Sequence, residues 1–225
     1  TAMTESMVEG PAGKPSAGTR EQLGITHDLA PSVPEYMKDG STTHLSAIDG
    51  DGNAVSITQT LLAGWGSRVT VPGTGVLFNN GMMWFDPEPG RPNSVAGDKV
   101  PLSNMAPVVI TDGGRARASI GSSGGRKIAF HNIQVAMNLI DRGMGMQAAI
   151  DAPVIDISTP LLVASTQIPP ETLEALAALG HDVSPRDPSR STGDFASPTG
   201  VLRHGDGTLE GGADPWYYPA TAKAL

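Results

Sequence analysis

The amino-acid sequence predicts an α+β fold in which short helices pack on an antiparallel sheet. Strand-like segments occur in pairs around turn residues, and helix-like segments follow them in blocks, a pattern typical of layered α and β structure. Glycine (28 residues) and proline (19 residues) are frequent in this chain of 225 residues, which favours many short elements over a long helical bundle.

The N-terminal region, residues 1–41, has the composition of a linker or surface tail. The stretch from Glu9 to Gly18 has no apolar period, and prolines recur within residues 30–34. The chain starts without methionine and without the basic and apolar regions of a signal peptide, so we expect a processed or truncated piece. Residues 42–225 carry the patterned segments and form the second region.

The first structured segment expected is a β-hairpin. Residues 42–48 alternate in polarity, the run Asp49-Gly-Asp-Gly-Asn53 is dense in turn residues, and residues 54–60 read as the second strand. The run also resembles the start of a calcium loop, but Ala54 and Thr60 stand where an EF-hand needs glycine and glutamate. A hairpin turn is the better interpretation.

Two further strand pairs are expected. Residues 107–110 predict a buried strand, residues 112–114 a turn and residues 116–120 the partner strand. The apolar pair Val201–Leu202 and the segment after the turn at residues 205–207 predict a final hairpin.

Three helices are expected after the second strand pair. The first follows residues 121–125 and stops near Gly143; its apolar stripe is predicted to comprise Ile128, Ile133, Ala136 and Ile140, widened by Val135 and Leu139. A short helix is expected over residues 146–152. Residues 170–179 predict the third, because proline stands in its first turn and Gly180 follows its end.

Charge and composition exclude several classes of function. Lys and Arg number 15 against 23 Asp and Glu, a formal charge of -8, so the chain is a poor candidate for nucleic-acid binding. With no cysteine there is no disulfide scaffold, thiolate zinc site or cysteine nucleophile. No apolar run approaches the ~18 residues of a membrane span. The histidines show no metal-binding spacing, so no metal site is expected; they are His27, His44, His131, His181 and His204.

The run Gly121-Ser-Ser-Gly-Gly125 has two interpretations that the residues leave open. It departs from a nucleotide phosphate loop, because Arg126, Lys127 and Ile128 follow where that motif needs lysine and then serine or threonine. Adjacent glycines between a strand and a helix allow backbone N–H groups to approach a ligand closely, as in an oxyanion hole. An ordinary tight turn would have the same sequence.

The junction Ser41-Thr42-Thr43-His44 is a candidate catalytic position. A polar segment with the composition of a linker ends there, and a predicted strand begins. If the bond before such a threonine is cut, its hydroxyl becomes a nucleophile whose own α-amine is the general base. Many strands begin with threonine, so spacing alone does not decide this.

Five motifs, in order, make residues 42–225 resemble the small subunit of the gamma-glutamyltranspeptidase family. They are Thr42-Thr-His-Leu-Ser-Ala-Ile-Asp-Gly-Asp-Gly-Asn-Ala-Val-Ser56, Leu77-Phe-Asn-Asn80, Pro101-Leu-Ser103 with Met105, Gly121-Ser-Ser-Gly-Gly125 and Gly212-Ala-Asp-Pro215. Residues 1–41 resemble the end of the large-subunit region that precedes the cut in this family.

The resemblance implies a precursor that cuts itself at the Ser41–Thr42 bond into two subunits sharing one αββα sandwich of the N-terminal-nucleophile hydrolase type. It implies that Thr42 is the nucleophile, that Thr60 supports it, and that Gly124 and Gly125 form the oxyanion hole. No metal or cofactor is implied. The expected partners are the large subunit of the same precursor, a small-molecule amide, and water or an amine as acceptor. A periplasmic or extracellular location is favoured, with any export signal in the missing large-subunit region.

The resemblance also identifies substrate-binding positions, several of which depart from the family pattern. Ser103 matches the first of two serines that hold the substrate carboxylate, and Asn104 replaces the second; the other matching positions are Asn80, Gly81 and Trp84. Leu62 stands where the family has Asn, Gly81 where it has an acidic or amide residue, and Trp84 where it has Asp.

Three functions therefore stay open. At family level the implied activity is glutathione hydrolysis or gamma-glutamyl transfer through a Thr42 acyl-enzyme. The altered positions favour, as an alternative, an acylase or amidohydrolase for non-glutamyl amides, because each lost polar partner of a charged substrate group costs about 1–3 kcal/mol. A further alternative is an inactive binding module.

Overall fold

The computed structural model describes residues 40–190, 193–218 and 220–223. The predicted linker-like end of the large-subunit region, residues 1–41, lies outside the described residues except for Gly40 and Ser41.

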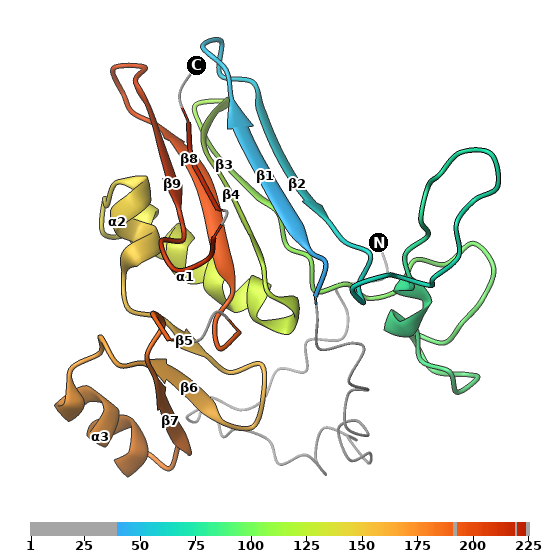
Figure 1. Cartoon of the computed structure of the whole chain (residues 1–225). Coiled ribbons are helices and arrows are strands. Elements are labelled where there is room, and N and C mark those ends of the chain that lie inside the picture. The colour runs from blue at the N-terminus through green and yellow to red at the C-terminus, as the bar shows by residue number, and fades with distance from the viewer. Residues whose placement is uncertain (1–39, 191–192, 219, 224–225) are drawn as a thin grey trace, which may run out of the picture. The chain divides into compact units, whose positions relative to one another are not determined.

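The central element is a four-stranded antiparallel sheet with the strand order β3-β4-β8-β9 (Figure 1). Its strands are β3 (Val108–Asp112), β4 (Arg115–Ser123), β8 (Ser197–Arg203) and β9 (Leu209–Ala213). Both predicted strand pairs are thus confirmed. The prediction that the first strand is buried is wrong, because β3 lies at the sheet edge and leaves Val109 44% exposed.

Two helices, α1 (Ile128–Ile140) and α2 (Met146–Asp151), cover one face of this sheet. The core between these layers joins Ala118, Ile120 and Leu202 of the sheet to Val135 and Leu139 of α1 and Met146, Ala149 and Ile150 of α2. Glycines in the sheet allow α2 to approach its strands closely. A Cβ atom on Gly200 of β8, for example, would lie only 2.8 Å from Met146 Sδ of α2. The predicted helix over residues 146–152 is confirmed.

The buried side of α1 differs from the predicted apolar stripe. Ile133 and Ile140 are 57% and 54% exposed, whereas the buried residues are Ile128, His131, Asn132, Val135, Asn138 and Leu139. The two asparagines fit in the interior because they have hydrogen-bond partners: Ser122 Oγ donates to Asn132 Oδ1, and Asn138 Nδ2 donates to the Ala149 carbonyl. Periodicity marks two apolar sides of this helix, and only packing decides which one is buried.

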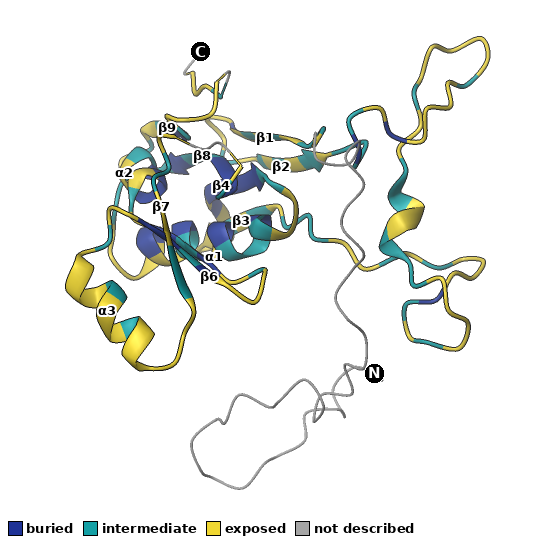
Figure 2. Cartoon of the chain, turned by 60° about the horizontal axis from the view of Figure 1, so that its bottom comes forward, coloured by how far each residue is buried: buried dark blue, intermediate teal, exposed yellow. Residues whose placement is uncertain are grey.

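The predicted hairpin is confirmed as β1 (Thr43–Ile48) and β2 (Ala54–Gln59), and it packs on the opposite face of the central sheet (Figure 2). Asp49 accepts hydrogen bonds from the backbone and side-chain nitrogens of Asn53, so its carboxylate stabilises the turn. Across the layers, Ser119 Oγ donates to the Val55 carbonyl (2.8 Å) and Ser56 Oγ to the Ile120 carbonyl (2.9 Å).

The hairpin places its polar side inward and its apolar side outward. Leu45, Val55 and Ile57 are 57%, 45% and 51% exposed on the outer side. The helices, the central sheet and the hairpin form one helical layer and two β-layers of the predicted αββα sandwich.

A third sheet, with three strands, was not predicted. It consists of β5 (Ile155–Asp156), β6 (Leu162–Ser165) and β7 (Val183–Arg186), and the helix α3 (Pro170–Ala178) connects the parallel pair β6–β7. The predicted helix over residues 170–179 is confirmed. Strands this short carry too little periodicity to be recognised.

Candidate active site

Thr42 and Thr60 meet at the open end of the hairpin. Thr43 pairs with Gln59 in the strand register, so the next residues outward on the two strands lie opposite each other. Thr42 Oγ1 donates a hydrogen bond to Thr60 Oγ1 at 2.9 Å. Two hydroxyls that are far apart in sequence are brought together by the length of the two strands and their turn.

Thr60 Oγ1 accepts a second hydrogen bond, from the backbone N–H of Leu62 at 2.8 Å. Leu62 has a φ of 73°, in the left-handed region. For a residue with a side chain, this conformation is roughly 1–2 kcal/mol less favourable than the right-handed one. The strained turn directs the Leu62 N–H at the hydroxyl that Thr42 contacts.

Ser41 is held against the segment that follows β2. Its Oγ donates to the Ala63 carbonyl at 3.1 Å and accepts from the Leu61 N–H at 3.0 Å. Gly40 also pairs with Ala63 in an isolated bridge. The Ser41–Thr42 peptide is therefore fixed on the same segment as Thr60.

The glycine turn follows β4, and its second glycine is the first residue of a 3-10 helix, η3 (Gly125–Lys127), that leads into α1. Gly124 and Gly125 have φ values of 138° and 64°, which side-chain-bearing residues rarely adopt. A Cβ atom on Gly124 would lie 2.6 Å from Ala196 Cα. Ser123, the residue before this turn, lines the same groove along β1 as Thr42. These conformations explain the glycines as a turn, and the oxyanion assignment stays a prediction.

Among the predicted substrate-binding residues, Asn80 is joined to the Thr60 segment. Its Oδ1 accepts a hydrogen bond from the Ala63 N–H at 3.0 Å. Gly81 and Trp84 are the ends of the next element, the 3-10 helix η2 (Gly81–Trp84). The Trp84 ring lies on Gly81, where an added Cβ atom would be 3.2 Å from Cζ3.

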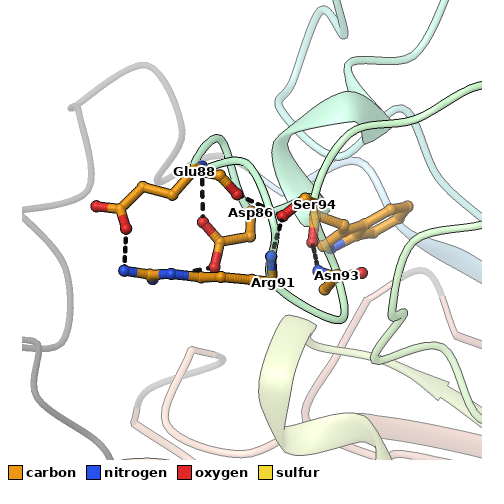
Figure 3. Close-up of polar contacts among 6 residues, drawn as sticks. Asp86, Glu88, Arg91, Asn93 and Ser94 are labelled. Atoms are coloured by element: carbon orange, nitrogen blue, oxygen red, sulfur yellow. Dashed lines mark hydrogen bonds and ion pairs between the residues drawn. The ribbon is translucent and has the colours of Figure 1, made fainter.

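The loop after η2 is fastened by polar contacts (Figure 3). Arg91 pairs with Asp86 at 3.1 Å and also with Glu88, while its backbone N–H donates to Ser94 Oγ at 2.8 Å. Asn93 Nδ2 donates to the Trp84 carbonyl at 2.6 Å. These contacts hold the backbone of Trp84 in place.

Ser103 and Asn104 are not connected to Thr42 by any hydrogen bond within the described part of the chain. Ser103 is exposed, and its Oγ accepts from the Met105 N–H at 3.2 Å. Asn104 Oδ1 is buried and has no hydrogen-bond partner there. Their assignment to substrate binding stays a prediction.

His44 forms a polar cluster that the sequence did not reveal. Nδ1 lies 2.8 Å from Thr58 Oγ1 and Nε2 lies 2.8 Å from Ser46 Oγ. Burial lowers the pKa of His44 to about 4, and burial also lowers that of His131 to about 4. The signal in the sequence is the place of His44 in the alternating strand, at a position that faces inward.

Within the described ranges, no group of three or more His, Asp or Glu side chains is arranged to hold a metal ion. No helix in these ranges combines the length and the apolar character needed to cross a membrane.

Comparison with known proteins shows which family this chain resembles. The sequence model of the family described as Gamma-glutamyltranspeptidase matches residues 14–224. The Acylase ACY 1 proenzyme of Pseudomonas sp. (strain SE83) is 38% identical over 176 residues, covering 78% of this chain and 31% of that protein. The Glutathione hydrolase proenzyme of Escherichia coli (strain K12) is 32% identical over 201 residues, covering 84% of this chain and 33% of that protein. The chain thus spans 31% to 33% of the length of these two relatives.

The fold agrees with this assignment. A solved acivicin-inhibited gamma-glutamyltranspeptidase superposes with a TM-score of 0.67 and 27% identity, covering 78% of this chain and 99% of that one. The predicted α+β fold of the N-terminal-nucleophile hydrolase type is confirmed. Sequence match and fold lead to one conclusion: the chain belongs to the gamma-glutamyltranspeptidase family.

Proposed function

We propose that this chain is the catalytic portion of an amide hydrolase or acyltransferase whose nucleophile is Thr42 Oγ, released by a cut at the Ser41–Thr42 bond. The observation that carries the proposal is the 2.9 Å hydrogen bond from Thr42 Oγ1 to Thr60 Oγ1. It is supported by the clamp on Ser41, which holds the bond to be cut beside this pair.

The cut begins when Thr42 Oγ attacks the Ser41 carbonyl carbon. The C–N bond breaks, the acyl group moves to oxygen as an ester, and the Thr42 nitrogen takes up a proton. Water then hydrolyses the ester, which leaves a carboxylate on Ser41 and a free α-amine on Thr42. Thr60 Oγ1 accepts the hydrogen bond that orients the attacking hydroxyl.

Turnover repeats the attack on a substrate amide. The free α-amine of Thr42 accepts the hydroxyl proton and passes it to the leaving amine, while Thr42 Oγ forms the acyl-enzyme. We assign stabilisation of the oxyanion to the backbone N–H groups of Gly124 and Gly125. Water completes hydrolysis, and an amine acceptor completes transfer.

The family-level substrate is a gamma-glutamyl amide, with glutathione hydrolysis or gamma-glutamyl transfer as the activity. A second candidate, an acylase for non-glutamyl amides, is favoured by the contact of the Trp84 ring with Gly81 beside Asn80. An indole ring in this position offers apolar surface and no charge partner for a glutamyl carboxylate or ammonium group. The similarity to an acylase proenzyme supports the same candidate.

We further propose that the partner of this chain is the large subunit of the same precursor. The curated relatives are proenzymes about three times as long as the matched segment. The outward-facing Leu45, Val55 and Ile57 supply an apolar face for that subunit to cover.

The experiment uses the full precursor and its Thr42→Ala variant. Mass spectrometry should find the wild-type protein cut between Ser41 and Thr42 and the variant uncut. Kinetics with a gamma-glutamyl anilide and a series of acyl anilides then separate the two substrate classes. Catalytically active wild-type material in which Ser41 is still joined to Thr42 would contradict the mechanism. Activity that is unchanged in Thr42→Ala would instead show that Thr42 does not carry it, which would favour the inactive binding module.

A further inference from the structure

The imidazole ring of His44 lies directly on the backbone of Gly121, where β1 crosses β4. A Cβ atom built on Gly121 would lie 2.1 Å from Cε1, 2.3 Å from Nδ1 and 2.5 Å from Nε2 of His44. Contacts under 3.0 Å are essentially never made by real Cβ atoms. The ring can occupy this place only because residue 121 has no side chain.

Hydrogen bonds fix the orientation of the ring in that place. Nδ1 is bound to Thr58 Oγ1 on β2 and Nε2 to Ser46 Oγ on β1, each at 2.8 Å. A neutral imidazole has one donor and one acceptor nitrogen, and a hydroxyl serves as either, so both bonds form together. Burial lowers the pKa of His44 to about 4, which keeps the ring neutral at neutral pH.

The contact lies between the two halves of the candidate active site. His44 is two residues after Thr42, and Gly121 is three residues before Gly124. At a rise of about 3.3 Å per residue, each site residue is within roughly 10 Å of the contact along its strand. The contacts between the layers advance in step along β2 and β4: Ser119 and Ile120 contact Val55 and Ser56, and Gly121 contacts His44, which pairs with Thr58. The Thr42 end of the hairpin and the Ser123 end of β4 therefore lie on the same side, and both residues line one groove.

We propose that His44 is a positioning residue: seated on Gly121 and bound to Thr58 and Ser46, its ring sets the distance and register between Thr42 and the Gly124–Gly125 turn. The inference rests on the proposed function, because it assigns His44 an effect on the reaction at Thr42. Without the ring, β1 can shift over β4, and the nucleophile and the oxyanion donors lose their alignment.

The test uses the self-processed enzyme made from the full precursor. His44→Phe keeps a ring but loses both hydrogen bonds; we expect kcat to fall by about 10–100-fold, the size of effect that a misplacement of about 1 Å produces. KM should change by less than about threefold, because substrate contacts are kept. His44→Gln, which retains a polar group near the Nε2 position, should recover part of the loss.

A pair of variants, at His44 and at Gly121, tests the packing contact between these two residues. Gly121→Ala should lower kcat, because its methyl group occupies the space of the ring. In the double variant His44→Ala with Gly121→Ala the methyl group fills part of the vacated space, so the combined loss should be smaller than the product of the single losses. Independent effects would overturn the proposal.

Ser56→Ala is the control for simple destabilisation. It removes a hairpin-to-sheet hydrogen bond, to the Ile120 carbonyl at 2.9 Å, without touching the ring of His44. It should lower Tm and leave kcat unchanged when assayed well below Tm. If His44→Phe also keeps the wild-type kcat, His44 is only structural and the inference is overturned. If turnover by the wild-type enzyme does not depend on Thr42, the proposed function is refuted, and the inference falls with it.

Discussion

At the scale of single residues, Thr60 is the acceptor on which the candidate nucleophile depends. Its Oγ1 accepts from Thr42 Oγ1 and from the Leu62 N–H, so removing this oxygen leaves two donors without their partner. Thr42 and Thr60 are far apart in sequence, but the two strands of the hairpin bring their ends side by side.

We therefore predict that Thr60→Val, which keeps the side-chain shape, slows both self-cutting and turnover by on the order of 10²-fold. Thr60→Ser keeps the oxygen and should recover most of the rate. Mass spectrometry of the Ser41–Thr42 cut and kcat of the processed fraction are the measurements. Cutting of Thr60→Val at the wild-type rate would remove Thr60 from the mechanism.

Buried histidines predict a pH dependence of stability. Burial lowers the pKa values of His44 and His131 from 6.5 to about 4. Between pH 4 and 6.5 the unfolded chain therefore binds more protons than the folded chain, so the free energy of unfolding falls as the pH decreases through this window. Above it, both forms are neutral and these groups contribute no slope.

We expect Tm to fall on acidification across that window and to fall less in His131→Gln, which lacks one of the two groups. Thermal denaturation of wild type and variant at several pH values is the measurement. An unchanged slope in the variant would show that the burial of His131 does not govern acid stability.

At the scale of elements, the strand–turn–helix unit around Gly124 and Gly125 uses its two glycines for different reasons. A Cβ atom on Gly125 would meet nothing within 4 Å, whereas one on Gly124 would collide with Ala196 at 2.6 Å. Only Gly124 therefore needs its glycine for packing as well as for backbone conformation.

We predict that Gly125→Ala lowers the free energy of unfolding by about 1–2 kcal/mol, because a residue with a side chain is strained in the left-handed conformation. Gly124→Ala should cost more, because Ala196, the residue before β8, must move away from the turn. Urea denaturation of the processed enzyme measures both values. Equal losses would show that the contact with Ala196 relaxes freely.

Elements also differ in how far the sequence predicted them. The hairpin and the two strand pairs were predicted because turn residues separate alternating segments, a local signal. The buried side of α1 was mispredicted because His131, Asn132 and Asn138 are buried. Asn132 and Asn138 each donate a hydrogen bond to a backbone carbonyl outside this helix. The strands β5, β6 and β7 were missed because they are only two, four and four residues long, too short for a recognisable period.

At the scale of the whole molecule, two of the apolar surfaces that the described residues leave exposed lie on the hairpin and on α1. One is the outer side of the hairpin, with Leu45, Val55 and Ile57. The other lies on α1, where Ile133, Met137 and Ile140 are 57%, 51% and 54% exposed at helical spacing. Surfaces of this kind fit burial by the proposed large subunit, so we expect the isolated chain to melt at a lower temperature than the precursor.

A substitution on the hairpin tests this directly. Ile57→Lys should change the stability of the isolated chain by less than about 0.5 kcal/mol, because the side chain is already half exposed. In the processed two-subunit enzyme the same lysine would be buried, with a loss of about 2 kcal/mol or more. Leu179→Lys, at a residue 78% exposed after α3, is the matched control. Equal effects of Ile57→Lys on both proteins would exclude the hairpin face from the subunit contact.

Some features of the candidate site were predicted from the sequence, and others appeared only in the structure. Thr42, Thr60 and the glycine turn were predicted from motifs, and the structure brings Thr42 and Thr60 into contact. The clamp by Ser41, the left-handed Leu62 and the seat of His44 on Gly121 were not predictable, because each depends on two segments that meet only after folding.

By itself the sequence determined the class of fold, the hairpin that carries Thr42 and the family to which the chain belongs, because turn residues, alternation and motif order are properties of neighbouring residues. Only the tertiary structure decided which sides of the hairpin and of α1 face inward, and which side chains contact the candidate nucleophile Thr42. Those outcomes depend on packing and hydrogen bonding between segments far apart in the chain, whose free energies no local pattern contains.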